Sequence, residues 1–228
     1  MKNKITIIGI IIIFAIVGVI GYFAMTDLMQ GVTLRKEVNT ISKLDVTKDD
    51  IDMTIKTKGD YAVVEKTIKE YMNTYGTNCK QLKNILDDET IAKILTAENY
   101  KNDGKEFVAS KEYIAKTKSE FNERINTLIE MSTEEKMMKA IEEKQLESSY
   151  VDLYKELMLG DEIKVDLQEI VQTLEEASKN INNILETQEK VIELLVNNKE
   201  KWNINNNNEI EFETQKLVDE YNNLINNL

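Results

Sequence analysis

Proline and histidine are both absent from the 228 residues. Because proline breaks helix interiors, its absence permits long helices with few irregular connections. The absence of histidine excludes Ser-His-Asp and Cys-His catalytic arrangements and zinc sites with histidine ligands. Cys79 is the only cysteine, so an intramolecular disulfide is also excluded.

Basic residues are too few and too dispersed for a nucleic-acid-binding surface. No run of four lysines or arginines occurs, and every acidic residue lies at or beyond Asp27. Residues 27–228 carry 41 acidic groups against 27 basic ones, the total of 29 less Lys2 and Lys4, for a net charge of −14. A phosphate-binding surface needs concentrated positive charge, so we expect no nucleic-acid partner and no broad adhesion to anionic lipid.

The N-terminus has the pattern of a membrane anchor. A short basic flank, residues 1–4, precedes residues 5–26, which contain no charged side chain. These 22 residues would form a helix of roughly 33 Å, enough to cross the hydrocarbon core of a bilayer. A cleaved signal peptide is the alternative, with Val19-Ile20-Gly21 as a passable cleavage site, but its apolar stretch should be shorter.

The charges nearest the apolar run predict the orientation. Lys2, Lys4 and the terminal amine lie directly before it, whereas Asp27 follows it. The positive-inside rule therefore favours a single-pass protein with a cytoplasmic N-terminus and an extracytoplasmic C-terminal domain.

Residues 27–60 are predicted to form a juxtamembrane helix and an extended connector. The helix covers about 27–44, and the connector covers about 45–58, where Ile51, Met53 and Ile55 alternate with polar residues as in a strand. One short strand cannot bury a face alone, so we interpret the connector as an extended arm.

Residues 61–228 are predicted to form one helical-bundle domain. Apolar residues recur at steps of three and four over about 61–86, 105–131, 132–158, 161–195 and 210–228, with a shorter helix near Ile91. The stripe over 161–195 has coiled-coil spacing, with Gln188 as its one polar member, which would fix register or face a wet end of the bundle. The expected fold is therefore all-α: a transmembrane helix followed by an elongated antiparallel bundle with coiled-coil character.

Local signals predict several details of this domain. Ser132-Thr133-Glu134-Glu135 is a capping box that places a helix start at Ser132, and 197–208 is an asparagine-rich polar loop. Trp202 in that loop would either pin it to the bundle or anchor a partner, and the first role is the commoner one. Cys79 lies within an apolar stripe, which predicts a buried structural thiol.

No residues emerge as catalytic, cofactor-binding or metal-binding candidates. A calcium loop aligned on Gly104 would place Lys101 and Ser110 at ligand positions, where neither supplies a carboxylate. Paired carboxylates such as Glu134-Glu135, Glu142-Glu143 and Glu175-Glu176 fit solvated helix faces. We therefore expect a protein that is not an enzyme and uses no cofactor or small-molecule ligand.

Three functions remain open at this stage. The first is a non-enzymatic binding or scaffolding module displayed outside a bacterial membrane, with a protein partner or self-association. The second is a cytoplasmic coiled-coil scaffold tethered to the membrane, of the division or cytoskeletal type. The third and most remote is a hydrolase that uses paired carboxylates.

Overall fold

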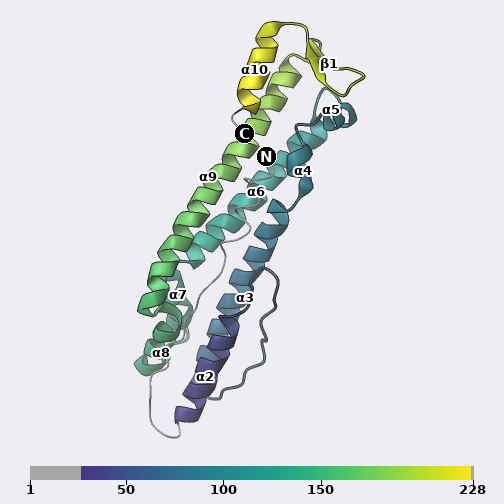
Figure 1. The fold of residues 1–228 in the computed structure, drawn as a ribbon. Helices are drawn as coiled ribbons and strands as arrows, with labels where there is room; N and C mark the ends of the chain where they lie inside the picture. The colour runs from purple at the N-terminus through teal and green to yellow at the C-terminus, as the bar shows by residue number, and fades with distance from the viewer. Residues whose placement is uncertain (1–26, 227–228) are drawn as a thin grey trace. The chain divides into compact units, whose positions relative to one another are not determined.

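The computed structural model describes residues 27–226 and their side chains at positions 29–160 and 167–226. The chain is mostly helical, as predicted (Figure 1). Its helices are α2 (Asp27–Ile41), α3 (Asp60–Leu86), α4 (Glu89–Lys93), α5 (Ala97–Asp103), α6 (Val108–Met131), α7 (Glu134–Glu142), α8 (Ser148–Leu159), α9 (Asp161–Asn197) and α10 (Gln215–Ile225). Among the described residues, no helix has both the length and the apolar content to cross a bilayer. The predicted anchor, 5–26, lies outside those residues.

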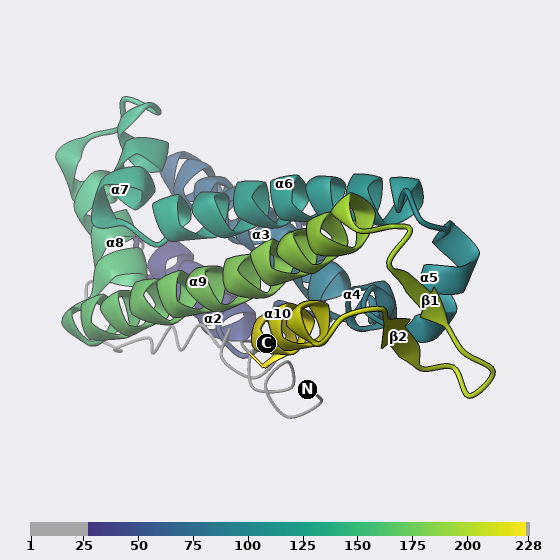
Figure 2. The same cartoon turned by 90° about the horizontal axis from the view of Figure 1, so that it is seen from above.

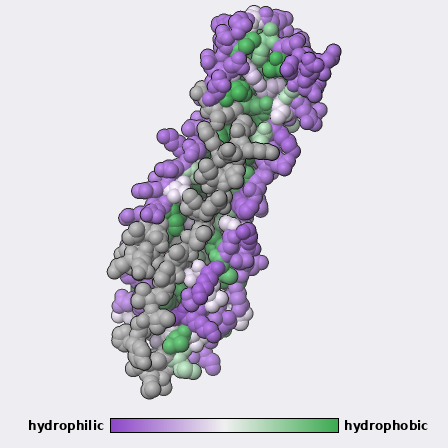
Figure 3. Space-filling view, viewed as in Figure 1, coloured by the Kyte–Doolittle hydropathy of each residue, from purple (hydrophilic) through white to green (hydrophobic). Residues whose placement is uncertain are grey.

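The described chain divides into two compact units, each built from two stretches of sequence. One, called unit A, comprises residues 27–83 and 124–175. The other, called unit B, comprises residues 84–123 and 176–226. Hydrophilic side chains dominate the surface that Figure 3 draws, in agreement with the high content of charged residues.

In unit A, helices α2 and α3 run parallel to each other. Gly31 of α2 lies beside the Tyr61 ring at the start of α3, and a turn and a half further on Glu37 contacts Lys69. The antiparallel arrangement was expected for residues 61–228, and α2, which precedes that range, does not share it. A parallel pair needs a connection that returns along the helices, and the arm over 45–58 supplies it.

The C-terminal part of α6 packs against α3 in the antiparallel sense. The Tyr71 hydroxyl donates to the carbonyl of Met131, and Arg124 contacts Asn78 further along α3. The predicted α3 stripe is confirmed up to Leu82, and Ile85 and Leu86 at its end are half-buried. Its buried members are Val64, Ile68, Tyr71, Tyr75, Cys79 and Leu82.

The predicted helix over 132–158 is interrupted. Its N-cap is Thr133, not Ser132: the Thr133 hydroxyl accepts from the N–H of Lys136. The helix ends at Glu142, and α8 begins at Ser148 after a turn in which Gln145 has a φ of +55°. The apolar stripe lapses over this turn, so no buried side chain holds a continuous helix there.

Unit B places the C-terminal half of α9 antiparallel to the first two thirds of α6 (Figure 2). Lys118 pairs with Glu189, and one turn further along α6 Asn122 pairs with Asn182. The two asparagine amides donate to each other, at 3.0 and 2.9 Å. Of the α9 stripe predicted from sequence, Ala177, Ile181, Val191 and Leu195 are buried within unit B, whereas Ile184 is half-buried.

The predicted polar loop, 197–208, contains a strand of a hairpin. Strands β1 (Trp202–Ile204) and β2 (Ile210–Phe212) pair antiparallel, so Ile210 belongs to β2 and not to the final helix as expected. Thr214 caps α10 by accepting from the N–H of Leu217. Helix α5, capped by Thr96, was not predicted.

Candidate interaction site

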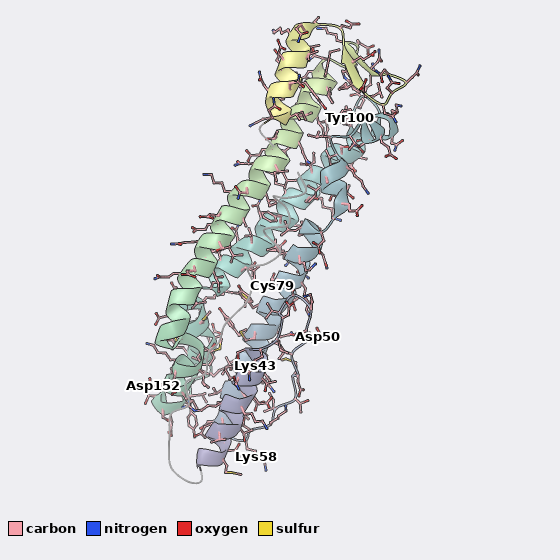
Figure 4. The ribbon with its side chains drawn as sticks, in the orientation of Figure 1. Lys43, Asp50, Lys58, Cys79, Tyr100 and Asp152 are labelled. Carbon is pink, nitrogen blue, oxygen red and sulfur yellow. The ribbon has the colours of Figure 1, made fainter. Side chains whose placement is uncertain are left out.

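The arm of unit A, residues 45–58, begins with a turn at 46–48, and from Asp50 onward it runs along α3 and antiparallel to it (Figures 1 and 4). Its end at Thr57 bonds to Glu65, and its beginning at Asp50 pairs with Lys80. Between these two helical residues α3 rises about 22 Å at about 1.5 Å per residue. The arm covers the same length between Asp50 and Thr57. This corresponds to about 3.2 Å per residue, which is the rise of a β-strand.

A buried ion pair holds the arm in place. Glu65 and Lys69 lie one turn apart on α3, 2.7 Å from each other, and each side chain is only 1% exposed. The Lys69 ammonium also donates to the carbonyl of Thr54 at 2.6 Å and to Glu37 of α2 at 3.2 Å. Lys69 thus connects both helices to the backbone of the arm, with three acceptors for its three protons.

Glu65 is the acceptor at the other end of the pair. Its carboxylate accepts hydrogen bonds from the backbone N–H groups of Lys56 and Thr57, at 3.0 and 2.8 Å. It also accepts one from the Thr57 hydroxyl, at 2.7 Å. Burial alone would raise the pKa of Glu65, but the hydrogen bonds from Lys69 and the arm outweigh it and hold that pKa below its ordinary value. Glu65 is therefore ionised at neutral pH.

A second, more exposed pair ties the arm to α2. The Lys56 ammonium lies 2.9 Å from Glu37 and 3.2 Å from Asp52, and these contacts, the first above all, raise the pKa of Lys56. Asp52 accepts the N–H of Thr54, which lowers the pKa of Asp52. Asp52 and Lys56 of the arm are thus paired with each other, and Lys56 is also paired with Glu37 of α2.

No family model, curated protein or solved structure matches the chain. Its function must therefore be inferred from the residues themselves.

A cavity of about 150 Å³ lies between the first part of the arm and α3. Its wall includes Leu44, Val46, Ile51 and Met72, with Asn73 and Lys80 among its polar members. The arm packs closely against α3 at Gly76, where an added Cβ would lie 3.5 Å from the Val46 carbonyl oxygen, an ordinary van der Waals contact. Neither cysteine nor serine lines the cavity. The Lys80 ammonium at its wall forms an ion pair with Asp50.

The residues singled out from the sequence have structural positions. Cys79 is fully buried, and burial raises the pKa of its thiol to about 12 (Figure 4). Gln188 is buried and donates to the carbonyl of Ile91 at 2.6 Å, so it fixes α4 against α9 and does not face a wet end.

Trp202 pins its hairpin to unit B, which was the favoured of its two predicted roles. It is 2% exposed, its indole N–H donates to the carbonyl of Leu195 at 2.8 Å, and the ammonium of Lys105 lies over its ring. Tyr100 and Phe107 pack around it.

The paired carboxylates considered for a hydrolase are exposed on the protein surface. All six residues of the pairs Glu134-Glu135, Glu142-Glu143 and Glu175-Glu176 are exposed. Across the part of the chain that the structure describes, no group of three or more acidic or cysteine side chains could hold a metal ion. Lys101 of the rejected calcium loop instead contacts Asn208 in the hairpin turn.

Sequence reasoning predicted the arm but missed the ion pair that holds it. The available signal was a Glu-to-Lys spacing of four, at Glu65 and Lys69, immediately beside the buried positions Val64 and Ile68. This site offers an extended backbone with charged and apolar side chains.

Proposed function

We propose that the chain is a single-pass membrane protein that displays a non-enzymatic helical binding or scaffolding domain outside a bacterial cell. The observation that carries the membrane part is the charge-free run of residues 5–26, which is long enough to cross a bilayer as a helix.

The arm supports binding as the role of the domain. It is a backbone segment held extended by buried charges, and pre-organised segments lose little conformational entropy when a partner binds. A carboxylate hydrolase would instead need an acid that stays protonated near neutral pH. Glu65 has the opposite shift, because hydrogen bonds lower its pKa.

Labelling of a single added cysteine tests the side of the membrane. Asn206 is exposed in the hairpin turn, whereas Cys79 is fully buried and can be left unchanged. We expect an impermeant maleimide to label Asn206→Cys on intact cells, while the unmodified protein stays unlabelled. Asn3→Cys, before the apolar run, is the matched control and should react only after lysis.

The two results separate the competing functions. Labelling of Asn206→Cys only after lysis would overturn the extracytoplasmic assignment and favour a tethered cytoplasmic scaffold of the division or cytoskeletal type. Release of the protein by a carbonate wash, which strips peripheral proteins but leaves transmembrane helices in place, would overturn the anchor itself.

A further inference from the structure

The outward edge of the arm has unpaired backbone groups. In an extended chain, successive residues direct their N–H and C=O groups to opposite edges. The Thr54 carbonyl and the Lys56 N–H bond inward, to Lys69 and Glu65 respectively, and the chain bends only at Thr57, whose N–H also bonds to Glu65. Met53 and Ile55 therefore direct their backbone groups outward, and among the described residues those groups have no hydrogen-bond partner.

This edge also carries exposed apolar side chains. Met53 is 41% exposed and Ile55 is 36% exposed, both on the segment whose inner edge is held by buried charges. An open strand edge with apolar side chains is a template on which another strand can pair.

We propose that the occupant of this edge is the same segment of a second copy of the chain, paired antiparallel about Thr54. The sequence from Asp52 to Lys56 is Asp-Met-Thr-Ile-Lys. When it is read against its own reverse, Asp52 meets Lys56, Met53 meets Ile55 and Thr54 meets itself. A two-fold axis thus places two apolar pairs across the interface, and it brings the Asp52–Lys56 pair of one copy, 3.2 Å apart within that copy, beside the same pair of the other.

The backbone geometry requires the same register. In an antiparallel pair, residues whose N–H and C=O groups both face the partner form the hydrogen-bonded pairs, and the residues between them form the closer non-bonded pairs. Met53 opposite Ile55 meets the first condition in both copies. Thr54 opposite Thr54 then falls at a non-bonded position, where the two Cα atoms are about 4.5 Å apart.

The pairing involves the arm alone and does not depend on residues 5–26. Five residues from each copy form a smaller contact than the roughly 1,200–2,000 Å² of stable complexes. We therefore expect a monomer–dimer equilibrium that shifts with protein concentration.

Disulfide trapping in the full chain in detergent tests the register. Thr54→Cys should form an intermolecular disulfide under mild oxidation with copper phenanthroline, because Cα atoms about 4.5 Å apart lie within the bonding range. Asp50→Cys is the matched control. Its side chain is 95% exposed, yet the two copies of residue 50 would lie about 26 Å apart, eight strand residues at about 3.3 Å each.

A charge reversal tests the partner. Adding Asp52→Lys to Thr54→Cys places like charges at both ends of the pairing, and we expect trapping about tenfold slower. Glu70→Lys, an equal change of charge on an exposed position of α3, should leave trapping unchanged. Circular dichroism of each variant establishes that it is folded.

Equal trapping of Asp50→Cys and Thr54→Cys would overturn the register, because it indicates random collision. A monomer at all concentrations by light scattering, together with no trapping at Thr54→Cys, would overturn self-pairing altogether. Both readouts are obtained in detergent, so they are independent of the side of the membrane on which the domain lies.

Discussion

Lys69 is a buried cation whose removal would leave buried anions without a partner. We expect Lys69→Met to lower the free energy of unfolding by about 3–5 kcal/mol, because Glu65 would remain desolvated and lose its ammonium. Chemical denaturation followed by circular dichroism measures this difference.

Lys66→Met is the matched control for that change. Lys66 lies one turn before Glu70 on the same helix, and both members of that ion pair are exposed. Its loss should leave stability nearly unchanged. Equal effects of the two substitutions would show that the buried pair has no special role in holding the arm.

Glu65 should make the stability of unit A depend on pH. Hydrogen bonds hold its pKa below the ordinary value of 4.5 in the folded protein, so the folded state favours the ionised form. This stabilisation is complete above pH 4.5 and is lost as the pH falls through the lower folded pKa. Glu65→Gln should therefore flatten the decline of stability below pH 4.5, and denaturation at a series of pH values measures it. A parallel decline in both proteins would contradict the assignment.

Hydrophobic periodicity predicted single buried residues well, because it depends only on which side chains share a helix face. Cys79 and the α9 stripe were identified in this way. Periodicity treats charged residues as solvent-facing, and for that reason Glu65 and Lys69 were missed. Their burial depends on hydrogen bonds to Thr54 and Thr57 of the arm. These two threonines do not belong to a helix, so helical periodicity does not reveal them.

At the scale of elements, the turn between α7 and α8 contains backbone strain. Gln145 has a φ of +55°, a conformation that disfavours residues with a Cβ. We expect Gln145→Gly to raise the free energy of unfolding by about 0.5–1 kcal/mol, because the relief of strain exceeds the entropy cost of glycine.

Glu143→Gly is the control for that turn. Glu143 is also exposed, but its φ is −62°, so glycine removes no strain there and should destabilise the protein. Thermal melts of the two variants should shift in opposite directions. A lower melting temperature for Gln145→Gly would show that other contacts of the glutamine outweigh the strain.

Helix boundaries marked by a glycine in the sequence were easier to predict than boundaries set by packing alone. Gly59, which has a φ of +59°, immediately precedes the start of α3 at Asp60, whereas the sequence around Gln145 contains neither glycine nor proline. The hairpin at 202–212 was missed because asparagine suits loops and turns alike, and its strands are held by the burial of Trp202 in unit B.

The whole molecule carries a net charge of −12 at pH 7, and its isoelectric point is about 4.7. We expect a solubility minimum near pH 4.7, where repulsion between copies vanishes. Light scattering of the full chain in detergent across pH 4–8 measures this. Increased scattering confined to neutral pH would contradict the role of net charge.

Each of the two compact units is discontinuous in sequence, and this has a consequence for inheritance. The borders near residues 83, 123 and 175 all fall inside helices α3, α6 and α9. No single crossover between genes can transfer either unit intact. A crossover at any of these three borders would divide a helix of the donor. The chain from Asp27 onward is therefore a poor source of exchangeable modules, and recombination should move it as one cassette.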